Sequence, residues 1–234
     1  MRYDCLIIDD EKELANNTAE YFNMFDVKTA AVYSAAEANV FLSNNEPGLV
    51  LLDINLSDGS GFELCKKIRQ TLNIPILFIS ARNTDDDKII ALNIGGDDYI
   101  EKPYSLGVLL AKVKVVLKRF ASVDSDASAA PKTDFDDGYL KLDSANKTVF
   151  VKGEEKKITS IEWKLLDYLI ANKNRLVTKN EIFENVWNDK FTTDGTLNVH
   201  IRKIREAIEK DAQDPKYIVT VWKEGYKFVA PGDQ

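Results

Sequence analysis

Apolar runs and amphipathic stretches alternate along the first 120 residues of the chain. Five short apolar runs are typical of strands buried in a sheet, and they cover residues 5–10, 27–32, 48–53, 75–80 and 98–102. Apolar residues recur at helical spacing in the intervening stretches, near residues 12–24, 35–44, 60–71, 85–94 and 106–119. This alternation predicts right-handed crossovers and a doubly wound α/β domain with a five-stranded parallel sheet. In such a domain the ligand site lies beyond the carboxyl ends of the strands.

The pattern changes after residue 121. Residues 122–137 hold almost no large apolar side chains and are rich in Ser, Ala and Asp, which is typical of a linker. We therefore expect a first domain over residues 1–121, a linker over 122–137 and a second domain over 138–234.

The second domain begins with a strand pattern and continues with helices. Short antiparallel strands are predicted, with turns at Ser144–Lys147 and Gly153–Glu155. An amphipathic helix follows, and Thr159 or Ser160 can cap its start. Two further helices are predicted over residues 178–187 and about 193–210, and then a hairpin that turns at Lys223–Gly225. This order predicts an α+β winged helix-turn-helix domain.

The formal net charge of −7 argues at first against a nucleic-acid partner. Residues 1–121 hold 13 Lys and Arg against 18 Asp and Glu, and residues 122–138 hold 1 against 5. Residues 139–234 hold 17 against 15, so only the second domain has a basic balance, and it is weak. Any DNA-binding surface must therefore come from local clustering of basic side chains.

The hydrophobic pattern of the chain and its cysteine content indicate a cellular compartment. No apolar run approaches the roughly 18 to 20 residues that span a bilayer, and the N-terminus turns acidic too early for a secretory signal. We expect a cytoplasmic protein without membrane insertion. Cys5 and Cys65, with a single histidine elsewhere, indicate buried or half-buried thiols and argue against a disulfide or a metal site.

Polar residues follow the predicted strands of the first domain. Asp9, Asp10 and Asp53 stand at strand ends, and Ser80 and Lys102 end two other strands. Any one of these aspartates alone could be a solvated loop residue or a helix cap. Together, the carboxylates favour a hard cation such as Mg²⁺, because they would otherwise repel one another. A carboxylate nucleophile with a metal, a hydroxyl and an ammonium group has what phosphoryl transfer requires.

Four stretches with this spacing carry a family resemblance: IIDDE (7–11), LLDINLSDGSGFELC (51–65), LFISAR (77–82) and GGDDYIEKPYS (95–105). On them, residues 1–121 resemble a CheY-like receiver, and the whole chain resembles the OmpR/PhoB family of response regulators. The resemblance implies that Asp53 is phosphorylated from a histidine kinase. It also implies a Mg²⁺ site in which Asp10 binds directly, Asp9 binds through water, and Asp53 and the backbone carbonyl of Asn55 complete the ligands.

The same resemblance assigns signalling roles near the pocket. Lys102 would pair with the phosphoryl oxygens, and Ser80 would donate a hydrogen bond to one of them. Tyr99 would be an aromatic switch that turns inward, although it could also be a half-buried strand residue. Arg82 and Asn55 would tune dephosphorylation. The Lys102–Pro103 bond is expected to be cis, which proline permits at modest cost.

Two residues of the first domain depart from the family pattern. Ser57 stands where the family usually has proline, which predicts a more mobile loop after the third strand. Val108 replaces a glutamate that pairs with a lysine of the preceding helix, here Lys88. Asp97 can still meet Lys112 across the family's dimer face. A single surface ion pair contributes about 0–1 kcal/mol.

The stretch from 192 to 210 resembles the family's recognition helix. Its apolar residues form one buried face, and Asn198 and Arg202 are candidate base readers on other faces, together with Arg205. Lys203 is expected to contact phosphate, and His200 is expected either to pack inside the domain or to contact phosphate. In the wing, Trp222 and Lys223 replace a common Arg-Gly pair, so Lys223 or Lys227 would supply the charge, and the role of Trp222 stays open.

These features predict a transcriptional response regulator and not an enzyme. Phosphorylation would promote a receiver homodimer that binds promoter DNA with paired half-sites, with RNA polymerase as a further possible partner. A Mg²⁺-dependent phosphatase would share the acidic pocket but would leave the winged helix unexplained. Two further hypotheses are a regulator that binds DNA independently of phosphorylation and a protein-interaction adaptor, and DNA-binding assays separate them.

Overall fold

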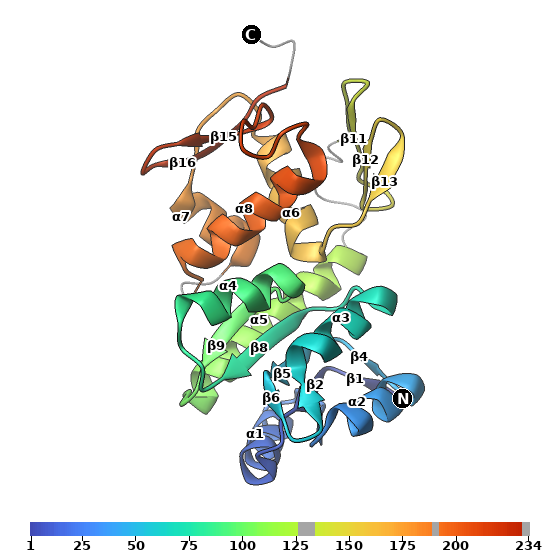
Figure 1. The fold of residues 1–234 in the computed structure, drawn as a ribbon. Coiled ribbons are helices and arrows are strands. Elements are labelled where there is room, and N and C mark those ends of the chain that lie inside the picture. Colours follow the sequence, from blue (N-terminus) through green and yellow to red (C-terminus); the bar gives the residue numbers. More distant parts are fainter. Residues whose placement is uncertain (126–133, 189–191, 231–234) are drawn as a thin grey trace. The chain divides into compact units, whose positions relative to one another are not determined.

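The structure is a computed structural model that describes residues 1–125, 134–188 and 192–230 (Figure 1). The chain divides into two units, Met1–Ala127 and Ser128–Gln234, and each has its own hydrophobic core. Within the described ranges, no helix is both long enough and apolar enough to cross a membrane.

The first unit contains the predicted five-stranded parallel sheet. Its strands lie in the order β3-β2-β5-β8-β9 and are β2 (Cys5–Ile8), β3 (Thr29–Val32), β5 (Val50–Asp53), β8 (Ile76–Ser80) and β9 (Asp98–Glu101). The register sets Ile7 beside Ala31 on one side and Leu51 on the other. Because β2, β5 and β8 lie inside the sheet, their side chains are buried on both faces, and this explains their nearly continuous apolar sequences.

Helices cover both faces of this sheet. They are α1 (Lys12–Met24), α2 (Ala35–Asn44), α3 (Gly61–Thr71), α4 (Asp85–Ile94) and α5 (Leu106–Ser125). Alternate strand residues enter two separate cores: Ile7 packs with α1 and α5, whereas Ile8 packs with α2, α3 and α4. The doubly wound α/β prediction is therefore confirmed.

Two short pairings complete this unit. Strand β1 (Arg2–Tyr3) pairs with β4 (Glu46–Pro47), and β6 (Asn55–Leu56) pairs with β7 (Gly59–Ser60) in an antiparallel hairpin directly after β5. This hairpin forms the loop that follows the candidate phosphoacceptor.

The second unit begins with an antiparallel sheet in the order β10-β11-β12-β13. Its strands are β10 (Phe135–Asp136), β11 (Leu140–Asp143), β12 (Thr148–Val151) and β13 (Glu154–Lys156). Strand β13 begins at Glu154, so the second predicted turn ends earlier than Glu155. Helix α5 reaches Ser125 and β10 starts at Phe135, so regular structure enters both ends of the predicted linker, whose residues 126–133 lie outside the described ranges.

Three helical segments and a hairpin complete the second unit. These are α6 (Ser160–Ala171), α7 (Lys179–Ile182) continued by the π-helical turn η1 (Phe183–Trp187), and α8 (Asp194–Ile208). A three-stranded sheet β14-β16-β15 follows, formed by β14 (Val177–Thr178), β15 (Ile218–Val221) and β16 (Gly225–Phe228). Helices α6 and α8 pack on each other in one core with the hairpin, as expected for a winged helix.

Candidate functional site

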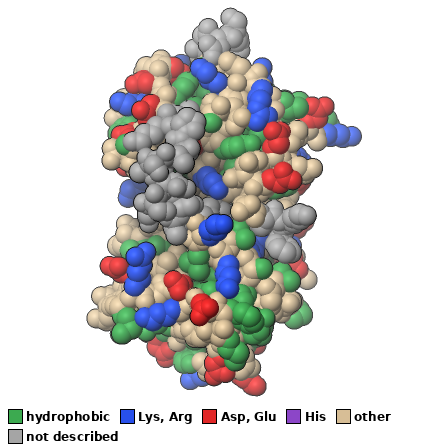
Figure 2. Space-filling model, turned by 180° about the vertical axis from the view of Figure 1, so that it is seen from behind, with side chains coloured by type: hydrophobic (Ala, Val, Ile, Leu, Met, Phe, Trp, Pro, Cys, Tyr) green, Lys and Arg blue, Asp and Glu red, His purple; other side chains and the backbone are tan. Residues whose placement is uncertain are grey.

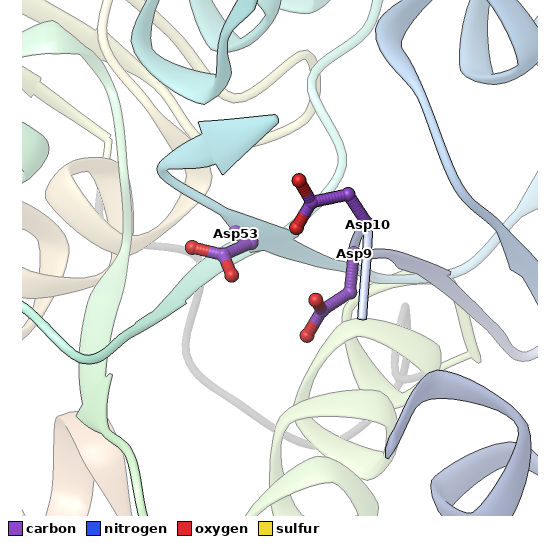
Figure 3. Close-up of side chains that lie close together, drawn as sticks. All are labelled: Asp9, Asp10 and Asp53. Carbon is purple, nitrogen blue, oxygen red and sulfur yellow. The ribbon is translucent and has the colours of Figure 1, made fainter. Parts of the chain in front are cut away.

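Three aspartates meet at the carboxyl ends of the central strands. Asp53 ends β5, and Asp9 and Asp10 follow β2 directly. Figure 3 shows the three side chains converging, and one carboxylate oxygen from each lies within 4.8 Å of the others. Asp9 and Asp53 are buried, and Asp10 is half-buried. The topology therefore produces the predicted acidic cluster, because parallel strands end at the same edge of the sheet.

Lys102 places one ammonium group among these carboxylates. Its Nζ lies 2.7 Å from an oxygen of Asp9, 2.7 Å from Asp53 and 2.7 Å from Glu11. Lys102 follows β9, and its backbone N–H donates to the carbonyl of Ser80 at 2.8 Å. The Lys102–Pro103 peptide bond is cis, as expected.

The charges at this edge do not balance. Burial raises the pKa of Asp9, and the hydrogen bonds from Lys102 and from the Glu11 backbone offset only part of that rise. Burial alone would lower the pKa of Lys102, but its bonds to Asp53, Asp9 and Glu11 outweigh it and raise the pKa above its ordinary value. Three carboxylates therefore share one ammonium group, and Asp10 adds a fourth carboxylate beside them. This set of hard oxygen donors with excess negative charge fits a Mg²⁺ ion.

The backbone after Asp53 is held close to its side chain. The N–H of Asn55 donates to Asp53 Oδ1 at 3.0 Å, and the N–H of Gly61 donates to the carbonyl of Ile54 at 2.8 Å. A Cβ at position 61 would lie 2.0 Å from the carbonyl oxygen of Asp53, so only glycine permits this approach. The start of α3 is thus tied to the end of β5.

Arg82 joins the two sides of the pocket opening. Its guanidinium donates to Asn55 Oδ1 from Nη2 at 2.9 Å and from Nε at 3.2 Å, and Nη1 lies 3.4 Å from Asp87. Its backbone N–H donates to the Oγ of the buried Ser80 at 3.2 Å. Its carbonyl accepts the hydroxyl of half-buried Tyr99 at 2.5 Å, and burial raises the pKa of this tyrosine. Ser80 and Tyr99 are therefore linked through one residue.

The predicted dimer-face residues are engaged inside the first unit. Asp97 Oδ2 pairs with Arg69 at 2.7 Å, and Lys112 pairs with Asp98 at 2.6 Å. The side chains of Asp97 and Lys112 are only 8% and 5% exposed in the single chain, and their meeting across a dimer face stays a prediction.

Lys88, the third predicted residue of that face, pairs with Glu101 of the same unit, and Asp85 lies 3.9 Å away. Glu101 thus occupies the role expected of the glutamate that Val108 replaces. Val108 is exposed, as are Ile89 and Ile90 of α4.

His200 lies inside the second unit. It is fully buried, its ring centroid is 5.7 Å from that of Trp187, and Nδ1 is 3.6 Å from a carboxylate oxygen of Glu162. A DNA contact by His200 is therefore corrected to a packing role inside the domain. Figure 2 shows one face of the molecule, on which Lys and Arg side chains intermingle with Asp and Glu side chains.

Glu162 also binds Lys203, whose Nζ lies 2.9 Å from the same buried carboxylate. Burial would raise the pKa of Glu162, but His200, Lys203 and the Thr159 backbone N–H lower it to about 2. Glu162 closes the capping box of α6 with Thr159, so one carboxylate caps α6 and anchors α8.

Other polar residues of α8 contact the wing. Arg205 donates to the carbonyl of Ile218 at 3.0 Å from Nε and to Thr220 Oγ1 at 2.8 Å. Exposed Asn198 accepts the hydroxyl of Tyr226 at 2.7 Å. Arg202 is exposed and pairs on the surface with Glu206 at 2.8 Å.

The wing turn presents basic and aromatic side chains. Lys223 is exposed with a φ of 64°, Lys227 is half-buried, and Trp222 is 80% exposed. The three residues lie on or beside one hairpin, β15–β16.

Comparisons with known proteins agree with both units. Residues 5–114 match the family described as response regulator receiver domain, and residues 153–228 match that described as transcriptional regulatory protein, C terminal. An uncharacterized transcriptional regulatory protein of Bacillus subtilis, YcbL, is 34% identical over 223 residues, covering 95% of this chain and 98% of its own. The response regulator SaeR of Staphylococcus aureus is 34% identical over 225 residues, covering 95% of this chain and 96% of its own.

The chain belongs to the OmpR/PhoB family of response regulators. A solved member, DrrB from Thermotoga maritima, is 28% identical with a TM-score of 0.52, covering 98% of this chain and all of its own. The family assignment gives a DNA-binding transcriptional regulator of a two-component system, with a cognate kinase and promoter DNA as partners, and not an enzyme.

Several functional neighbours of the site were missed in the sequence. Glu11 reaches Lys102, Asp58 bonds to the start of α2, and Glu162 anchors α8. Glu11 stands next to the acidic pair and Asp58 within the motif after Asp53, so their positions offered a signal. Glu162 lies three residues after Thr159, which is the spacing of a capping box.

Replacing Lys102 should change how the response regulator depends on Mg²⁺. The Lys102→Met variant should lose about 3 kcal/mol of stability in metal-free buffer near neutral pH, because Asp9 and Asp53 would lose their cation. Added Mg²⁺ should then raise its Tm more than it raises that of the wild type. Differential scanning fluorimetry measures both, with exposed Lys118→Met of α5 as control. Equal Mg²⁺ responses in all three proteins would contradict this account.

The buried Glu162 should make the second unit acid-sensitive. Its folded pKa of about 2 lies below the ordinary 4.5, so its stabilisation is complete above about pH 4.5 and is lost as pH falls toward 2. The loss should reach roughly 3 kcal/mol in the wild type and be absent in Glu162→Gln. Urea unfolding followed by tryptophan fluorescence reports on this unit alone, since Trp163, Trp187 and Trp222 all belong to it.

The exposed substitution Glu184→Gln on η1 is the matched control, and it should unfold with the acid dependence of the wild type. A Glu162→Gln variant with that same dependence would show that the carboxylate is not the source of the effect.

Proposed function

We propose that this response regulator accepts a phosphoryl group on Asp53 from its histidine kinase and answers by binding promoter DNA as a homodimer. The convergence of Asp9, Asp10 and Asp53 around Lys102 supports the acceptor role most directly. In this proposal Asp10, Asp53 and the backbone carbonyl of Asn55 would hold Mg²⁺ directly, and Asp9 would act through water. The protein acts in the cytoplasm.

Phosphoryl transfer forms a bond between a carboxylate oxygen of Asp53 and phosphorus, while the phosphorus–nitrogen bond to the kinase histidine breaks. When bound, Mg²⁺ neutralises charge on the phosphoryl oxygens. Lys102 supplies a second positive charge, already 2.7 Å from Asp53. The bond from the Asn55 N–H to Asp53 Oδ1 orients the carboxylate, so its other oxygen faces Lys102.

Signalling away from the phosphate runs through Ser80 and Tyr99. Ser80 Oγ accepts the Arg82 N–H, and Tyr99 donates to the Arg82 carbonyl. When Ser80 turns to donate to the phosphoryl group, it must give up the geometry that holds Arg82. Tyr99 then loses its fixed acceptor, which supports an inward movement of its ring as part of a shift between two states.

The homodimer would use the face of α4, β9 and α5. On this face the exposed Ile89, Ile90 and Val108 would supply apolar surface to the dimer interface, beside the ion-paired Lys88. Dimerisation raises the effective concentration of two DNA-binding units on paired half-sites. RNA polymerase is proposed as a further partner at the promoter.

The DNA-binding surface combines α8 and the wing. Exposed Arg202 and Asn198 are the proposed base readers, while Arg205 and Lys203 reach DNA only by leaving Ile218 and Glu162. Lys223 and Lys227 extend the basic surface along the hairpin and are proposed to contact phosphates.

Replacing Asp53 tests the acceptor. The Asp53→Ala variant should not form a stable phosphoprotein with acetyl phosphate and Mg²⁺, because no other carboxylate lies beside both Lys102 and the Asn55 N–H in the described part of the chain. Phosphate-affinity electrophoresis measures this directly. Exposed Asp26→Asn is the control and should be modified at the wild-type level. Stable phosphate on Asp53→Ala would refute the assignment.

Tryptophan fluorescence tests the wing. Trp222 is 80% exposed, whereas Trp163 and Trp187 are 8% and 1% exposed, so acrylamide should quench chiefly Trp222. If Lys223 binds phosphate, promoter DNA should shield its neighbour Trp222 and reduce quenching at least about twofold. The Trp222→Phe variant should show little quenching with or without DNA.

The beryllofluoride adduct distinguishes shielding of Trp222 by DNA from shielding of Trp222 by another part of the protein. Shielding by DNA alone supports a wing contact, whereas shielding by beryllofluoride and Mg²⁺ without DNA would place Trp222 against protein. Unchanged quenching with saturating DNA would remove the wing from the binding surface.

A further inference from the structure

The loop after Asp53 is tied to a different helix. Asp58 lies in the two-residue turn between β6 and β7, and its carboxylate accepts the N–H of Ala35 at 2.8 Å and of Ala36 at 2.9 Å. Those groups are the first two N–H donors of α2 and have no partner within the helix. The bonds therefore connect the phosphoacceptor loop to α2 across more than twenty residues of sequence.

The N-terminus of α2 suits a carboxylate. Ser34 caps the helix by accepting the N–H of Glu37. Asp58 accepts the two preceding N–H groups, which the Ser34 side chain does not bind. Helix dipoles favour negative charge at this end, and these backbone bonds lower the pKa of Asp58. Asp58 therefore stays ionised and bound at neutral pH.

The β6–β7 turn lacks the proline that the family usually has there. Ser57 fills the position before Asp58, where proline would fix φ. The loop also contains Asn55, whose carbonyl is a proposed Mg²⁺ ligand. A metal ligand on an unrestrained loop binds more weakly, because ordering the loop costs conformational entropy on binding.

We propose that Asp58 is a positioning residue that holds the β6–β7 turn on α2 and so presents the Asn55 carbonyl to Mg²⁺. The inference rests on the proposed Mg²⁺ site. Asp58 touches neither metal nor phosphate, and it acts through the short hairpin whose register pairs Asn55 with Ser60. The tether replaces the rigidity that a proline would provide.

The test is a Mg²⁺ titration of the full-length protein, followed by the amide signals of Asn55 and Gly61 in ¹⁵N spectra. Asp58→Ala should weaken Mg²⁺ binding about tenfold, as loss of a residue that orients a metal ligand does. Asp58→Asn, which keeps one acceptor oxygen but no charge, should fall between it and the wild type. Hydrogen exchange at Ala35 and Ala36 should accelerate in the alanine variant.

Ser34→Ala is the matched control, because it removes the other cap of α2 and leaves the bonds of Asp58 in place. It should bind Mg²⁺ as the wild type does. The double variant Ser57→Pro with Asp58→Ala should recover most of the lost affinity if the tether acts by restraining the loop.

The outcomes separate the metal site from the tether. If wild-type protein shows no Mg²⁺ response at Asn55, the proposed metal site fails. If it responds but Asp58→Ala binds equally well, the tether alone is refuted. If Ser34→Ala weakens Mg²⁺ binding as much as Asp58→Ala does, the stability of α2 is responsible and the tether is refuted. If Ser57→Pro does not restore the Mg²⁺ affinity of Asp58→Ala, another property of Asp58 is responsible, and the tether is again refuted.

Discussion

One ammonium group shared by three carboxylates is the interaction on which the receiver unit depends. Lys102 lies 2.7 Å from each of Asp9, Asp53 and Glu11, and Asp10 adds a fourth carboxylate beside them. The parallel sheet creates this crowding, because β2, β5 and β9 all end at one edge. In the proposed site a divalent cation would relieve the excess negative charge, and a phosphoryl group would restore it. Each ligand would therefore change how strongly Asp53 holds Lys102, so metal, phosphate and lysine would share one charge balance.

The backbone around this charge is restrained from several directions. Gly61 lets the first turn of α3 touch the Asp53 carbonyl, and Asp58 fastens the following turn to α2. Arg82 spans the opening to Asn55, and its carbonyl holds Tyr99. These contacts come from different crossovers of the sheet. A phosphoryl group on Asp53 would therefore disturb packed elements and not a free loop, which is the condition for a discrete switch between two states.

The sequence could predict the sheet and the acidic pocket because both follow from strong local rules. Strands buried on two faces are apolar throughout, and strand ends mark the site. No such rule predicts the ion-pair partners of charged residues that lie outside these patterns. Asp97 and Asp98 are adjacent, yet one meets Arg69 and the other Lys112, because neighbouring side chains of a strand point to opposite faces. Asp58 resembles a solvated turn residue until α2 is placed beside it.

The recognition helix shows the same difficulty in a helical setting. A step of one residue turns a side chain by about 100° around α8, so Arg202 reaches solvent while His200 and Lys203 reach Glu162. Arg205 then fixes the opposite side of the helix to the wing. These bonds fix α8 to α6 and to the hairpin. In the proposed DNA-binding surface, buried charges would therefore set the positions of the exposed groups, and Glu162 would influence binding without touching DNA.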